Sequence, residues 1–129
     1  MTPRLAVEPL AVTRAGPGKW KVRWRVTNDG DGPLQLTAIA APHGRFRSRD
    51  HAIDVALAAG GSFEPQLEIA CAEPAGTEIE NTFLIITAQA AGKPWRILAR
   101  MRVRVGADGV PHPVTERIDV QEVGSSGQG

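Results

Sequence analysis

The sequence predicts an all-β protein built as an antiparallel sandwich of about seven strands. Apolar and charged residues alternate strictly in two segments, and clusters of Gly, Pro, Asn and Asp recur between short apolar runs. The length of 129 residues, with 42% apolar and 22% charged residues, is that of one ordinary globular domain. We therefore expect a single domain over residues 1–123. A flexible tail is expected over residues 124–129, which read Gly-Ser-Ser-Gly-Gln-Gly.

The two clearest strands span residues 19–27 and 95–105. Because successive side chains of a strand point to opposite faces, one face of each strand is apolar and the other is basic. The apolar faces carry Trp20, Val22, Trp24 and Val26 in the first strand, and Trp95, Ile97, Ala99, Met101, Val103 and Val105 in the second. All three tryptophans are therefore expected in the core.

The other predicted strands are less regular and cover residues 4–13, 34–41, 52–57, 63–71 and 79–90. Pro9 predicts that the first strand breaks and changes its partner at the edge of a sheet. Pro65 favours an edge position or an irregular start for the strand at 63–71. Two alternatives remain open for residues 110–123, which either add an eighth strand or hang free of the sandwich.

The segment from Val26 to Leu36 resembles a pattern of immunoglobulin-like domains of the ASH, major-sperm-protein and CARDB types. A strand ends in Val-Thr-Asn, a Gly-rich turn follows, and the chain continues as Pro-Leu-Gln-Leu. The later Gly60-Gly61-Ser62-Phe63 is similar to a turn in the same families. The resemblance covers residues 5–105 and implies an immunoglobulin-like sandwich. It also implies a role as an adhesion, scaffold or adaptor module without catalysis. Fold and function are separate inferences, however.

Charge and cysteine usage narrow the function classes. The formal net charge is +1, whereas a dedicated nucleic-acid binder carries a basic excess, so we do not expect nucleic acid as the partner. A single cysteine, Cys71, allows no internal disulfide and suits a reducing compartment. The amino terminus lacks an apolar leader, and no apolar run reaches the ~18 residues of a membrane span. We therefore expect a cytoplasmic protein without a membrane contact.

The predicted hairpin at residues 82–104 carries the strongest candidate for a binding surface. A connecting loop of two or four residues turns Leu84 and Ile86 inward and leaves Phe83 and Ile85 outward, and a three-residue loop reverses them. In either register two large apolar side chains share the outer face with Leu98. Three arginines frame this face: Arg96, Arg100 and Arg102. Apolar side chains beside arginine are typical of interface cores.

Two explanations of this outer face remain open. Another protein, or a second copy of this chain, covers it in the first explanation. In the second, the carboxy-terminal segment with Ile118 and Val120 folds over it. The first makes the chain a non-catalytic protein-binding module or a small accessory subunit of a larger assembly.

The alternative function is ligand or nucleic-acid binding through the basic loop at residues 43–51. Arg45, Arg47 and Arg49 alternate around Phe46 in this loop, and basic residues beside an aromatic can hold phosphate and stack a base. A second basic stripe, Lys21, Arg23 and Arg25, is expected to face solvent beside Glu64 and Glu68 if the strands at 19–27 and 63–71 share a sheet. Opposite charges placed in this way favour a solvated, charge-matched face over a binding site.

No catalytic or metal site is expected. His43 and His51 lie near Asp50 and Asp54, but without the spacing of a metal motif. Cys71 falls on the inward face of its strand, where a thiol is usually inert. The chain contains no Gly-x-Ser-x-Gly elbow and no phosphate-binding loop before a helix. We therefore expect no enzyme and no cofactor.

Overall fold

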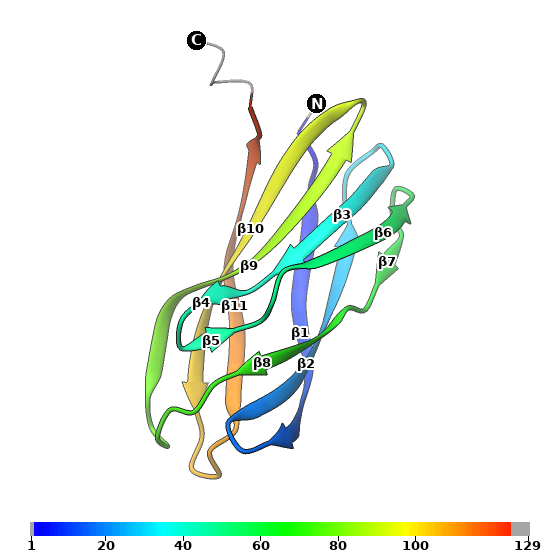
Figure 1. The fold of residues 1–129 in the computed structure, drawn as a ribbon. Helices are drawn as coiled ribbons and strands as arrows, with labels where there is room; N and C mark the ends of the chain where they lie inside the picture. Colours follow the sequence, from blue (N-terminus) through cyan, green and yellow to red (C-terminus); the bar gives the residue numbers. More distant parts are fainter. Residues whose placement is uncertain (1, 125–129) are drawn as a thin grey trace.

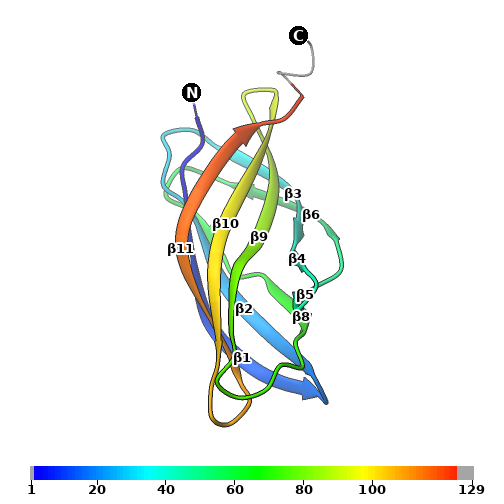
Figure 2. The same cartoon turned by 90° about the vertical axis from the view of Figure 1, so that its left-hand side faces the viewer.

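The computed structural model describes residues 2–124, which fold as two antiparallel sheets packed face to face in an open sandwich (Figures 1 and 2). The predicted tail at 124–129 lies outside the described residues except for Gly124. Within the described range no helix is long and apolar enough to cross a membrane. The all-β prediction is confirmed.

Sheet A has six strands and sheet B has five, and the paired neighbours are often distant in sequence. The strands of sheet A, in spatial order, are β1 (Leu5–Gly16), β2 (Lys19–Asn28), β8 (Gln66–Ala70), β5 (Phe46–Arg47) and β4 (Pro42–His43), with β7 (Ser62–Phe63) also paired to β2. The strands of sheet B are β11 (Pro111–Glu122), β10 (Lys93–Val105), β9 (Glu78–Ala90), β3 (Leu34–Ala40) and β6 (His51–Leu57).

Residues 2–124 therefore contain eleven strands, so the prediction of about seven strands was too low. Residues 42–47 form a small hairpin of two-residue strands, β4 and β5, which are too short to display alternation. Pro65 separates β7 from β8, which confirms the irregular start predicted there. The carboxy-terminal segment supplies β11, so it forms an additional strand and does not hang free.

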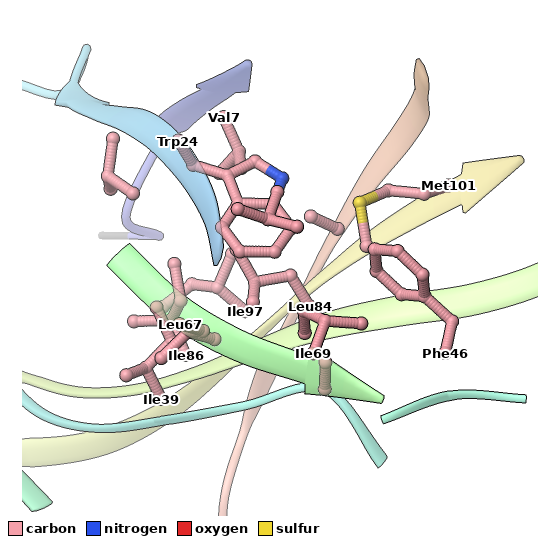
Figure 3. Packing of buried hydrophobic residues seen from close by; sticks show 14 of the residues in the cluster. Val7, Trp24, Ile39, Phe46, Leu67, Ile69, Leu84, Ile86, Ile97 and Met101 are labelled. Carbon is pink, nitrogen blue, oxygen red and sulfur yellow. The ribbon is translucent and has the colours of Figure 1, made fainter. Parts of the chain in front are cut away.

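The two clearest sequence predictions are confirmed by the core. Every apolar residue predicted inward in β2 and β10 is at most 8% exposed. Trp24 is completely buried and meets the Phe46 ring edge-on, with the ring centroids 6.5 Å apart. Figure 3 shows Trp24 and Phe46 together with Ile97 and Leu84 between the two sheets. A core filled from both sheets fixes which face of each strand is left for function.

The prediction that Pro9 breaks the first strand and changes its partner is wrong. β1 pairs with β2 on both sides of Pro9, and the chain absorbs the proline in a register shift between Pro9 and Ala11. β1 lies at the edge of sheet A. A proline without an N–H group is tolerated at an edge because one side of the strand makes no ladder bonds there.

A two-residue loop joins β9 to β10, since Ala90 pairs with Lys93. Ala91 and Gly92, the two loop residues, have φ angles of 52° and 76°. Positive φ at both positions is the geometry of a type I′ turn, which suits the twist of a hairpin. This loop selects the first of the two registers, with Leu84 and Ile86 fully buried and Phe83 and Ile85 on the outer face.

Asn28, at the end of β2, is a fully buried polar residue that joins three segments of the chain. Its side-chain Nδ2 donates to the carbonyls of Gly32 (2.9 Å) and Leu57 (3.1 Å), and its Oδ1 accepts from the amide of Gly30 (3.0 Å). Its backbone amide donates to the Gly61 carbonyl at 2.8 Å, and its carbonyl accepts from the Gly60 amide at 2.8 Å. These bonds hold the β2–β3 turn against the connection from β6 to β7.

We predict that Asn28→Ala lowers the free energy of unfolding by about 1–3 kcal/mol, because it leaves buried carbonyls and an amide without partners. Urea denaturation followed by tryptophan fluorescence measures the change. Asp29→Ala is the matched control, since Asp29 is the exposed neighbour in the same turn and should change stability by less than about 0.5 kcal/mol. Equal losses in the two variants would contradict this role of Asn28.

Candidate functional site

The six residues predicted as a partner site lie together on the outer face of β9 and β10. We call this set the hairpin face: Phe83, Ile85, Arg96, Leu98, Arg100 and Arg102. Leu98 stands opposite Ile85, and Arg100 stands opposite Phe83. The apolar centre and its arginines therefore form one continuous surface on sheet B.

The apolar side chains of the hairpin face are half-buried in the isolated chain. On one side Ile85 has the small Ala40 of β3 as its cross-strand neighbour. On the other side, β11 places Val114 opposite Arg102, and Val114 is 60% exposed. It is the one large hydrophobic residue among residues 2–124 that is exposed to this degree. Sequence reasoning missed Val114 because its neighbour in space is fixed only by the pairing of β11 with β10.

The arginines of the hairpin face are incompletely paired. Arg102 contacts Glu116 at 3.0 Å, and the Nε of Arg100 lies 4.0 Å from the same carboxylate. That Nε is buried and makes no hydrogen bond within the described chain. Arg96 has no ion pair among the described residues. The face thus combines an apolar centre with guanidinium groups that retain unused donors.

The carboxy-terminal segment does not cover the hairpin face, so that explanation is overturned. β11 lies beside β10 as the next strand of sheet B, as Figure 2 shows. Ile118 and Val120 stand opposite Ala99 and Ile97, and both pack against the core. Their apolar surface is used inside the sandwich.

The three arginines of the predicted basic loop are divided by the structure. Arg45 sits in the β4–β5 turn, where its Nε donates to Glu73 at 3.0 Å. This hydrogen bond raises the pKa of the Arg45 guanidinium above its usual value. Arg47 and Arg49 make no ion pair among residues 2–124. They line a depression that Arg45 does not line. The loop therefore does not act as one cluster of three cations.

Arg47 and Arg49 line an open depression of about 340 Å³ on the outer face of sheet A. We call it the basic groove, and it is lined by Lys19, Arg47, Ser48, Arg49, Glu68 and Ala70. Lys19 was not assigned to this cluster from the sequence, because no local pattern reveals that β8 lies between β2 and β5. Phe46, the aromatic residue of the loop, is fully buried against Trp24 and cannot stack on a ligand.

The charge-matched stripe predicted on β2 is present at one end of the strand. β2 and β8 are neighbours in sheet A, as assumed. Arg25 contacts Glu8 at 3.2 Å and Glu64 at 3.3 Å, and Arg23 lies 3.7 Å from Glu64. These pairs are solvent-exposed and are each worth about 0.2–1 kcal/mol.

The histidines and acidic residues considered as metal ligands do not assemble into a site. Among the described residues no group of three or more His, Cys, Asp or Glu side chains could hold a metal ion. His43 accepts a hydrogen bond from the Arg45 amide at its Nδ1, and Asp54 accepts one from Gln35. These contacts stabilise loops and strand edges.

Cys71 belongs to the core, as predicted, and is 5% exposed, although β8 ends one residue before it at Ala70. Burial raises the pKa of the Cys71 thiol above its usual value. A raised pKa reduces the thiolate fraction, and the thiolate is the nucleophile and the metal ligand. The position of Cys71 therefore suits core packing.

Comparison with protein-family models, with curated proteins and with solved structures found no match. The geometry itself defines the class: this chain is an all-β protein built as a two-sheet antiparallel sandwich. The hairpin face on sheet B and the basic groove on sheet A are its two candidate surfaces.

We predict that the Cys71 thiol of the folded protein reacts slowly with a disulfide reagent such as DTNB at pH 8, because it is buried and because burial raises its pKa. The same chain unfolded in urea should react rapidly, with the reagent releasing one equivalent of its coloured thiolate per chain. Stopped-flow absorbance measures both rates. A folded thiol that reacts as fast as the unfolded one would contradict its assignment to the core.

Proposed function

We propose that this chain is a non-catalytic protein-binding module, or a small accessory subunit of a larger assembly, that contacts another protein or a second copy of itself through the hairpin face. We further propose an immunoglobulin-like sandwich of the ASH, major-sperm-protein or CARDB type, working in the cytoplasm. The single unpaired cysteine supports that compartment.

The arrangement of the longer strands supports the immunoglobulin-like assignment. β1, β2 and β8 share one sheet, and β3, β9 and β10 share the other. Immunoglobulin domains divide their A, B and E strands from their C, F and G strands in the same way. Two features depart from that pattern: β6 pairs with β3, and β11 extends sheet B beyond β10.

The observation that carries the proposal is the unused chemistry of the hairpin face. Phe83, Ile85 and Leu98 form an apolar centre that no described segment covers. Within residues 2–124, Arg96 lacks an ion pair and Arg100 retains a buried Nε–H without an acceptor. Unsatisfied buried donors cost free energy in the isolated chain, and a partner carboxylate or carbonyl would satisfy them. Arginine and apolar residues at the centre of a patch are the usual composition of binding hot spots.

We predict that the double variant Leu98→Asp/Arg100→Glu abolishes the association made by the wild-type chain. Light scattering behind size-exclusion chromatography reports self-association, and quantitative affinity capture with the tagged chain reports other partners. A charge placed in the apolar centre and a reversed charge beside it should weaken either contact by about a hundredfold or more.

Two controls keep this experiment interpretable. Leu98→Ala/Arg100→Ala removes the same contacts with less risk to folding, and thermal unfolding verifies that both variants fold. Arg4→Glu changes an exposed arginine outside both candidate surfaces and should leave every association intact. If folded variants of Leu98 and Arg100 keep the wild-type oligomeric state and partners, the hairpin face is not the contact.

A further inference from the structure

The basic groove lies on sheet A, on the opposite side of the sandwich from the hairpin face, and has a distinct construction. Lys19 of β2, Ala70 of β8 and Arg47 of β5 form one cross-strand row. Neighbouring strands are about 4.8 Å apart, so the backbones of Lys19 and Arg47 stand roughly 10 Å apart. The small Ala70 side chain leaves the space between them open. Arg49 lines the same depression from the segment that leaves β5.

Lys21 is the next residue of β2 on the same face as Lys19, and it lies opposite Glu68 of β8. Lys19, Lys21, Arg47 and Arg49 form no ion pair within 4.0 Å in the described chain, and neither does Glu68. Four cationic side chains and one carboxylate leave this end of the sheet with a clear positive excess. The nearby arginines differ, since Arg25 and Arg45 each contact a carboxylate of the chain itself.

We propose that the basic groove binds an acidic segment of a partner protein in an extended conformation. Alternate side chains of an extended peptide lie about 6.6–6.8 Å apart on one face, which is the spacing of Lys19 and Lys21 along β2. Acidic residues at every second position of the segment therefore face successive cations. A chain laid over Ala70 has Arg47 and Arg49 on its other side.

The lining of the basic groove favours a peptide over a single-stranded nucleic acid. Binding of single strands combines cations with exposed aromatic rings on which the bases stack. No aromatic side chain lines this groove, and the aromatic residues of its two flanking strands, Trp20, Trp24 and Phe46, are buried in the core. An acidic peptide requires only cations and hydrogen-bond donors, which the groove supplies.

The contact depends on exposed charges, so salt screens it strongly. We expect association that is fast and weakens steeply between low and physiological ionic strength. The hairpin face relies on apolar contact and is less sensitive to salt. The two surfaces therefore differ in a property that separates this proposal from the function proposed above.

Fluorescence anisotropy with a labelled peptide of about six residues, alternating Glu and Ser, tests the proposal, since such a peptide spans roughly 20 Å when extended. The full chain should bind it saturably at low salt. Lys19→Gln/Arg47→Gln should weaken binding by about tenfold or more, because each wall of the groove loses one of its cations. Arg23→Gln/Arg25→Gln, the matched control on the same sheet face, should have a much smaller effect because those arginines are already paired.

Glu68→Gln supplies a test that a misfolded variant cannot imitate, since removal of the one carboxylate in the groove should tighten binding. Three results would overturn the proposal: no saturable binding by the wild-type chain, an equal loss in the two double variants, or no gain from Glu68→Gln. Tighter binding of an oligothymidylate of the same length would also overturn it, in favour of nucleic acid. Leu98→Ala/Arg100→Ala, which lowers the net charge by only one unit, should bind the peptide nearly as well as the wild-type chain whether or not the hairpin face has a partner.

Discussion

The hydrogen bonds of buried Asn28 are the constraint on which the arrangement of the two sheets depends. The chain leaves sheet A at the end of β2 and enters sheet B as β3. After the short strands β4 and β5 of sheet A it forms β6 in sheet B, and it then returns to sheet A as β7 and β8. Asn28 contacts two of the connections between the sheets, the one from β2 to β3 through Gly30 and Gly32 and the one from β6 to β7 through Leu57 and Gly61. An amide side chain is suited to this position because it donates and accepts at once. The strands that follow these two connections take part in both candidate surfaces: β8 lies beside β2 under the basic groove, and β3 lies beside β9 next to the hairpin face.

The alternating segments were predictable because a strand with one buried face alternates apolar and polar residues along the sequence. β2 and β10 show this alternation over their whole length, and every apolar residue predicted inward in them is buried. Strands β4 and β5 could not be found, since two residues show no period. The effect of Pro9 was misjudged because a proline in an edge strand, on the side without ladder bonds, only shifts the register. Sequence alone does not tell which side of a strand is unpaired.

How well each candidate surface could be predicted depends on how close in the sequence its residues lie. The hairpin face joins two strands connected by two residues, so the sequence of the hairpin contains nearly all of it. Its outer border of Val114 and Glu116 belongs to β11 and depends on a pairing that only the fold reveals. The basic groove joins Lys19 to Arg47 across β8, three segments far apart in the chain. The arginine loop that looked continuous in sequence was divided, because Glu73 lies beside Arg45 and away from Arg47 and Arg49.

Bulges in β11 and β9 decide which residues the outer face of sheet B presents on either side of β10. In β11 the register shifts opposite Arg100 and Met101, so that Glu116 is the extra residue. Because of that shift Pro113 and Ile118 both face the core, although their spacing places them on opposite faces of a regular strand. The same shift turns Glu116 toward Arg100 and Arg102.

In β9 the extra residue lies between Ile79 and Thr82, beside Asn81 with a φ of 59°, and it keeps Ile79 in the core. Both changes of phase are visible in the sequence as apolar residues that move from odd to even positions. A break in alternation within one strand is therefore a sign of a bulge. Here the bulge in β11 places the Glu116 carboxylate at the border of the hairpin face, beside Arg100 and Arg102.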